Sequence, residues 1–135
     1  MIYNIYAYFK DCFPGEKIFV NMKDFTENIQ SIPERYIMIT ETGATETPWF
    51  QFEEFPFQLF FQDIDAPKCR KLAHEFHDAI NNKFGLILPS VVVDGVAYLE
   101  VVTAQISVIN KPQSLGYGEN GFAQFSSNYN IKRKG

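Results

Sequence analysis

The sequence DAPKCRKLAHEFHDAINNKFG, residues 65–85, predicts the central helix of this chain. Asp65 is a suitable N-cap, Pro67 is tolerated in a first turn whose N–H groups lack helical partners, and Gly85 can end the helix in a left-handed conformation. A helix of this length needs a partner surface in water. Because the flanking segments are typical of strands, we expect that partner to be a sheet. The apolar stripe that would face it recurs at three- and four-residue spacing: Cys69, Leu72, Ala73, Phe76, Ile80 and Phe84.

A second helix and several strands are expected around this element. Residues 2–12 keep helical spacing, although their β-branched and aromatic content leaves a strand as the alternative. Residues 49–63 alternate aromatic and polar side chains, which fits two strand segments bent at Pro56 or one long hairpin arm. Proline confines that point to an edge or a bulge. We expect strands at six further places: residues 17–22, 36–42, 86–93, 96–102, 104–109 and 122–132.

Turn and loop signals separate these elements. Asp94-Gly95 is a residue pair preferred in two-residue type I′ hairpins and joins two of the expected strands. Residues 23–32 and 43–48 are expected to be loops, and residues 110–121 are expected to be a glycine-rich loop. The order helix, strands, helix, strands indicates one α+β domain over residues 1–135. It is predicted to be a mostly antiparallel four- to six-stranded sheet with two helices packed on one face.

Aromatic content and charge narrow the class of function. The chain has 14 Phe, 7 Tyr and 1 Trp among 135 residues, and aromatic side chains are favoured at protein interfaces. An oligomer and an aromatic-rich monomer core are therefore even alternatives. The net charge of −4 argues against high-affinity nucleic-acid binding, which needs Lys and Arg to displace phosphate counterions. The short basic run at residues 132–134 is expected to be a solvated tail.

The cysteines and the hydropathy pattern indicate a cytoplasmic setting. The N-terminus lacks the charged region and cleavage site of a secretory signal. Cys12 and Cys69 are therefore expected to be free buried thiols in a reducing cytoplasm. No apolar run reaches the length of a membrane span, and we expect no contact with a membrane.

Three motifs that could signal chemistry have simpler explanations. His74 and His77 are three residues apart, whereas a zinc-protease helix places its histidines four apart, so we expect a solvated helix surface and no metal. The G-x-G-x-x-G match at residues 116–121 leads into a strand, so we expect a flexible or docking loop. Glu53 and Glu54 are expected to face solvent. No catalytic constellation emerges, and we predict no enzymatic activity and no cofactor.

The C-terminal third carries a pattern that resembles a known family. Residues 112–121 read PQSLGYGENG, and residues 126–131 read SSNYNI. The pattern is similar to that of the tail-terminator proteins of long-tailed bacteriophages, often described as minor capsid or tail-completion proteins. These commonly show a P-x-x-L-G-x-D/E-x-x-G loop, then a strand with Ser, Asn and an aromatic residue. Gly118 stands where that pattern has an acid, with Glu119 directly after it, and Gln62 stands where many relatives carry arginine.

The resemblance implies a structural role in the virion for a single tail-terminator-like domain, residues 1–135. Such proteins form a ring, usually of six subunits, on the head-proximal end of the tail tube, at the tail–head junction. The ring ends tube polymerisation and binds the head-completion or connector protein. The implied partners are other copies of the chain, the tail tube protein and that connector, and DNA would pass through without specific binding. The residues expected to reach a partner are Gln113, Ser114, Leu115, Tyr117, Glu119, Asn120, Thr45, Glu46 and Trp49.

Two other functions stay open at this point. A different head–tail connector component, such as a head-closure or adaptor protein, would differ in which tube or portal surface it contacts. A small ligand-binding or enzymatic α+β domain could use the Phe-rich strands as a pocket. The sequence argues against that second alternative, because it lacks convergent polar groups that would orient a substrate.

Overall fold

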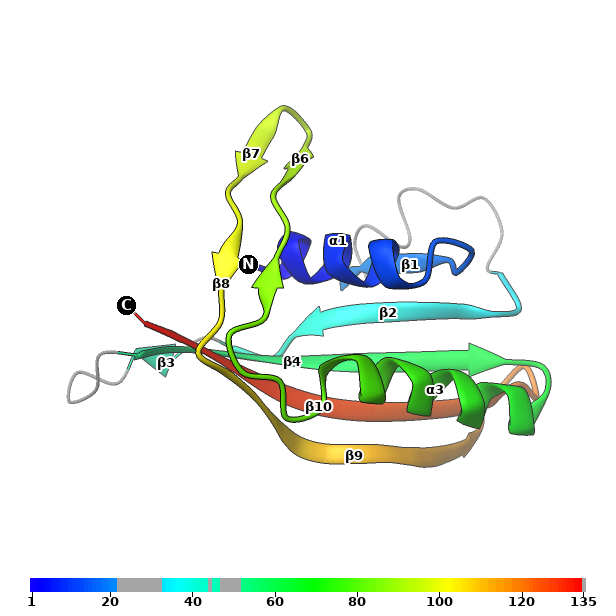
Figure 1. Cartoon of the computed structure of the whole chain (residues 1–135). Helices are drawn as coiled ribbons and strands as arrows, with labels where there is room; N and C mark the ends of the chain where they lie inside the picture. The colour runs from blue at the N-terminus through cyan, green and yellow to red at the C-terminus, as the bar shows by residue number, and fades with distance from the viewer. Residues whose placement is uncertain (22–32, 44, 47–51, 135) are drawn as a thin grey trace.

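Two helices predicted from the sequence pack on one face of a mixed sheet in the computed structural model (Figure 1). The structure describes residues 1–21, 33–43, 45–46 and 52–134. The elements are α1 (Ile2–Cys12), β1 (Ile18–Val20), β2 (Tyr36–Glu41), β3 (Thr45–Glu46), β4 (Phe52–Asp63), α3 (Ala66–Ile80), β5 (Ile87–Leu88), β6 (Val91–Val93), β7 (Val96–Tyr98), β8 (Val101–Val102), β9 (Gln105–Tyr117) and β10 (Ala123–Lys134).

The main sheet has six strands in the described part of the chain. Its order is β1-β2-β4-β10-β9, and β3 also pairs with β4. β1 and β2 are parallel, whereas the other pairs are antiparallel. Side chains alternate along β4, so Phe57, Leu59 and Phe61 are buried with the helices in one hydrophobic core. The predicted α+β class, with a mostly antiparallel sheet and two helices on one face, is confirmed.

Helix α3 begins as predicted and ends earlier than predicted. The Asp65 carboxylate accepts a hydrogen bond from the Lys68 backbone N–H at 3.2 Å, which makes Asp65 the N-cap. The helix stops at Ile80, and Asn82 takes a positive φ of 53°. The expectation that Phe84 continues the buried stripe is therefore wrong. Phe84 lies outside the helix, is 72% exposed and bridges to Gln105.

Helix α1 forms, so the alternative of a strand over residues 2–12 is wrong. Phe9 of α1 and Phe13, the C-cap residue directly after it, pack on α3: their rings stack on Phe76 with centroid distances of 4.9 and 4.3 Å. The Tyr8 hydroxyl donates to the Ala79 carbonyl at 2.7 Å. Burial raises the pKa of Tyr8 to about 12, which keeps this donor protonated. These contacts fix the two helices side by side on the sheet.

The aromatic strand β4 runs unbroken through Pro56, so of the two alternatives the one with strand segments bent at Pro56 is wrong. The Pro56 carbonyl accepts from the Thr42 backbone N–H at 3.1 Å, on the side of β2. In a strand the N and O atoms of one residue point to the same side. The missing N–H of Pro56 therefore faces the position where β2 has already ended at Glu41, and the pairing of Pro56 with Asn130 of β10 continues.

Two segments expected to be loops contain strands. Residues 110–117 belong to β9, which pairs with β10 along its length, and the turn is confined to residues 118–122. Register shifts in this ladder and a positive φ of 83° at Gly116 accommodate the glycine and proline content. Thr45 and Glu46 form β3 against β4. The expected loop at residues 23–32, half of 43–48 and the start of 49–63 lie outside the described residues.

Candidate functional site: an exposed arm and an exposed sheet edge

The residues expected to bind a partner lie on different elements. The expectation of a loop at residues 110–121 is wrong for Gln113, Ser114, Leu115 and Tyr117, because all four are on strand β9, where all are exposed. Two others, Glu119 and Asn120, lie exposed in the turn that follows. Thr45 and Glu46 pair through their backbones with Glu54 and Glu53 of β4. Trp49 lies outside the described residues.

The distal half of β9 forms an exposed sheet edge, which we call the β9 edge surface. Tyr117 is 69% exposed and Leu115 is 49% exposed, so two large apolar side chains lie exposed close together on the strand. At the start of β9, residues 83–84 lie along the outer side, where the Ile106 N–H donates to the Lys83 carbonyl at 3.0 Å. Beyond that point no described strand pairs with the outer side. The surface comprises Ile109, Lys111, Gln113, Leu115 and Tyr117.

A second exposed element, which we call the arm, spans residues 86–102. It consists of two small two-stranded sheets, β5–β8 and β6–β7, which project from the main sheet and run past α1 (Figure 1). Asp94 and Gly95 at its tip have φ angles of 52° and 77°. Positive φ at both central residues is what a type I′ turn requires, so the predicted hairpin turn is confirmed.

Among the described residues the arm has five exposed large apolar side chains, whereas the predicted sites have Leu115 and Tyr117, and our sequence reasoning missed the arm as a contact surface. Leu99 is 80% exposed and Val92 is 69% exposed. A signal was present: residues 91–93 are three consecutive valines, and an isolated two-stranded hairpin cannot bury both of its faces. The exposed apolar side chains of the arm are Ile87, Val92, Val96, Leu99 and Val102.

Asn4 of α1 holds the base of the arm. Its side-chain amide donates to the carbonyls of Pro89 and Leu99 at 3.0 and 2.9 Å, so it joins both sides of the hairpin to the helix. The ring of Tyr3 packs on that of Tyr98 with a centroid distance of 5.1 Å. Asn4 is only 1% exposed, and its two donors are matched to two acceptors. The direction of the arm is therefore set by α1.

Replacing Asn4 with alanine is expected to lower the free energy of unfolding by about 1–3 kcal/mol, because two part-buried carbonyls lose their donors. Urea denaturation measures this loss, and hydrogen exchange of residues 91–98 should speed up. Asn128→Ala is the matched control, since the Asn128 amide donates to Asn110 at 3.4 Å in an exposed position. Unchanged exchange in the arm of Asn4→Ala would show that Asn4 does not anchor it.

A groove of about 510 Å³ lies between the arm, α1 and β1. Tyr3 and Tyr6 of α1, Phe19 of β1 and Val92 of the arm contribute apolar surface to it, and Asp94 is the acidic residue among the described lining residues. The groove shows that the arm tip runs beside β1, which is one end of the sheet order. It offers apolar surface without a cluster of polar groups aimed at one point.

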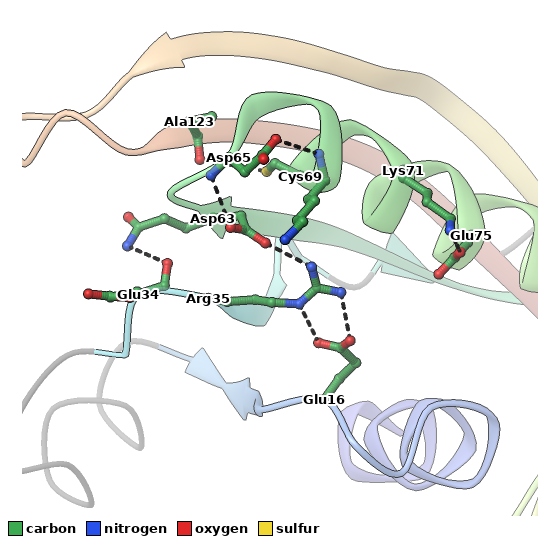
Figure 2. Close-up of polar contacts among 11 residues, drawn as sticks. Glu16, Glu34, Arg35, Asp63, Asp65, Cys69, Lys71, Glu75 and Ala123 are labelled. Atoms are coloured by element: carbon green, nitrogen blue, oxygen red, sulfur yellow. Dashed lines mark hydrogen bonds and ion pairs between the residues drawn. The ribbon is translucent and has the colours of Figure 1, made fainter.

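An ionic brace holds the end of the sheet opposite the arm (Figure 2). Arg35, just before β2, donates to both carboxylate oxygens of Glu16 at 3.0 and 2.7 Å and to Asp63 at 2.7 Å. These hydrogen bonds, foremost those to Glu16, raise the pKa of Arg35. The second oxygen of Asp63 accepts from the Asp65 backbone N–H at 3.0 Å. Because each of these charges is paired within the chain, the brace is structural.

His77 lies in the core, so the expectation that it lies on a solvated surface is wrong. It is a buried residue of α3, and its Nδ1 lies 2.9 Å from the hydroxyl of Tyr129 on β10. Burial raises the pKa of Tyr129 to about 12 and lowers the pKa of His77. The protonated hydroxyl can therefore donate to a neutral imidazole. His74 is exposed, as predicted.

Acidification is expected to destabilise the fold through His77. Its pKa is lowered in the folded state, so the unfolded chain binds a proton first as the pH falls below about 6.5. Above that pH the contribution of neutral His77 to the free energy of unfolding is fully present, and it is lost as the pH falls below it. Urea denaturation at about pH 7.5 and 5.5 should show a smaller loss in His77→Gln than in wild type. His74→Gln is the control and should retain the wild-type loss; equal losses in all three proteins would contradict the assignment.

The basic run at residues 132–134 is part of β10, so the expectation of a solvated tail is wrong. Arg133 forms an ion pair with Glu53 at 2.6 Å, and Lys132 lies 3.8 Å from Glu54. The same pairs show that these two glutamates do not simply face solvent. The two glutamates reduce the positive charge that the end of β10 could offer to a phosphate backbone.

The two cysteines differ. Cys12 is exposed, which contradicts the expectation of a buried thiol, whereas Cys69 is buried as expected. Burial raises the pKa of Cys69 to about 11, so its thiol stays protonated. Within the described residues, no group of three or more His, Cys, Asp or Glu side chains could hold a metal ion. No helix in that part of the chain is long and apolar enough to cross a membrane.

The arrangement offers two exposed apolar surfaces, and the buried or paired titratable groups Arg35, Asp63, His77 and Tyr129 are engaged in structural contacts. The arm and the β9 edge surface are suited to protein–protein contact, since both expose large apolar residues on a hydrogen-bonded scaffold. No protein-family model matches the chain, and no curated protein matches it.

Proposed function

We propose that this chain is a structural subunit that assembles with copies of itself into a ring at the head-proximal end of a bacteriophage tail. The ring would end polymerisation of the tail tube and bind the head connector. The proposal joins the sequence resemblance at residues 112–131 to one structural observation, the presence of two different exposed apolar surfaces on a subunit with a braced core.

Two different surfaces are what a ring requires. A two-fold dimer needs one self-complementary patch, whereas a ring of more subunits repeats a contact between two unlike patches. The arm and the β9 edge surface are unlike in shape: one is a projecting hairpin, and the other is the side of a long strand (Figure 1). Each could therefore contact a neighbour without competing with the other.

Charge supports passage of DNA through such a ring. The chain carries a net charge of −4, and Lys132 and Arg133 are paired with glutamates. A net negative charge repels phosphate and lets a duplex slide. The tail tube protein and the head connector would then bind the two rims of the ring. Glu119 and Asn120 in the β9–β10 turn and the short strand β3 are candidates for those contacts.

Labelling of intact virions tests the proposal. A chain with an epitope tag should be found by immunogold electron microscopy at the tail–head junction. Cross-linking in the same particles should join it to the tail tube protein. Cross-links to the portal without the tube would instead indicate a head-closure or adaptor protein, and label elsewhere or absent from virions would contradict a role in the connector.

A further inference from the structure

We infer that the arm of one copy packs on the β9 edge surface of the next copy, in a single head-to-tail contact that repeats around the assembly. This inference rests on the proposed function for its setting, but it concerns self-association alone. In this inference, the partner that binds each of the two exposed surfaces is another copy of this chain.

Position in the fold makes the two surfaces partners between copies and not within one. Residues 91–94 at the arm tip line a groove with residues 18–20 of β1, so the tip lies at one end of the sheet order. β9 is the strand at the opposite end of that order. A contact between opposite edges of identical subunits is heterologous, and it closes into a ring when its rotation permits.

The two surfaces can contact each other through apolar side chains and through the backbone. The arm presents aliphatic side chains, of which Val92 and Leu99 are the most exposed, whereas Leu115 and Tyr117 stand out from β9. The outer side of β9 also presents backbone N–H and C=O groups without a strand partner in the described part of the chain. A hairpin placed along such an edge satisfies those groups while its side chains bury apolar area.

The charges of the two surfaces are complementary. Asp94 and Glu100 are the charged residues of the arm between residues 87 and 102, and both are exposed. Lys111 is the charged residue of β9, and it is also exposed; the next acid, Glu119, lies beyond the strand in the turn. Opposite charges favour an arm-to-edge contact and disfavour contact between two arms.

The size of the surfaces predicts how assembly depends on concentration. Each contributes fewer residues than the roughly 20–30 per side of a standard interface, so one contact is weak by itself. Ring closure gives every subunit two contacts, which raises the effective strength of each. We therefore expect a steep transition from monomer to closed ring with few open intermediates.

A cysteine-pairing experiment tests which surfaces meet. In a Cys12→Ser background, which removes the exposed native thiol, Leu99→Cys and Leu115→Cys are made in separate full-length chains that differ in mass by a tag. The two proteins are mixed at up to about 1 mM and oxidised. Disulfide-linked dimers that contain one chain of each kind are expected. Dimers of like chains, assembly without any cross-link, or a monomer throughout the concentration range would overturn the inference.

Charge reversal supplies a second readout. Glu100→Lys and Lys111→Glu should each raise the midpoint concentration of assembly by about fivefold or more, and the double variant should restore it. Arg70→Glu, on the exposed side of α3, is the control and should leave the midpoint unchanged. Loss without restoration in the double variant would contradict the pairing. Virion labelling is independent of these results, so a ring with another contact would leave the proposed function standing.

Discussion

Replacing Phe76 with alanine is expected to lower the free energy of unfolding by about 3–5 kcal/mol, because the substitution leaves a cavity in the core. Phe76 has no exposed surface and lies where both helices meet the sheet. Its ring stacks on Phe9 and Phe13 of the α1 region and contacts Phe61 of β4 edge-on at 5.4 Å. The cavity would therefore weaken two helices and a strand together.

Denaturant unfolding followed by circular dichroism measures this change, and Phe84→Ala is the matched control. The same substitution at Phe84 removes a ring that is largely exposed and should cost under about 1 kcal/mol. Similar losses at the two positions would contradict the placement of the core. A loss under about 1 kcal/mol at Phe76 would do so as well.

Replacing Leu115 and Tyr117 together with serine is expected to abolish assembly while the subunit stays folded. Both side chains are exposed on β9, so the isolated chain loses little packing. In a contact they would serve as buried anchors, and removing two such anchors typically weakens association by about 100-fold or more. Sedimentation velocity over a concentration series measures the loss, and thermal unfolding of the monomer checks the fold.

Phe84→Ser serves as the control for a general loss of surface hydrophobicity. Phe84 is more exposed than either residue but lies outside both surfaces, beside the start of β9. It should leave the assembly midpoint unchanged. Unfolding of the Leu115/Tyr117 double variant as a monomer would refute the view of these residues as contact residues, as would wild-type assembly by the variant.

Local sequence patterns predicted those structural elements that are determined by residues a few positions apart in the sequence. The stripe on α3 and the Asp65 cap could be read because helical spacing and capping involve neighbours in the sequence. The Asp94-Gly95 turn is local in the same way. These elements were enough to predict the class of fold.

Long-range contacts determined what the sequence did not reveal. Pro112 and Gly116 in residues 110–117 are typical of a loop, but β10 provides a strand partner with bulges that tolerates them. Asn4 was not singled out because its acceptors lie 85 and 95 residues away. His77 looked like a surface residue because its partner Tyr129 is 52 residues distant. Tertiary pairing outweighs local propensity at each of these positions.

The candidate surfaces likewise depend partly on local patterns and partly on long-range contacts. Leu115 and Tyr117 were identified from a resemblance and are exposed, although on a strand in place of a loop. The arm was predicted as a hairpin, but its role as a surface depended on knowing that it stands apart from the main sheet. Exposure of an apolar strand follows from the arrangement of all its neighbours, which no local pattern contains.

Native mass spectrometry of the purified chain over a concentration series tests self-association most directly. The account predicts one closed oligomer of defined stoichiometry in equilibrium with monomer, and its loss when Leu115 and Tyr117 are both replaced with serine. A wild-type chain that stays monomeric up to about 1 mM, or an oligomer that the double substitution leaves intact, would contradict it.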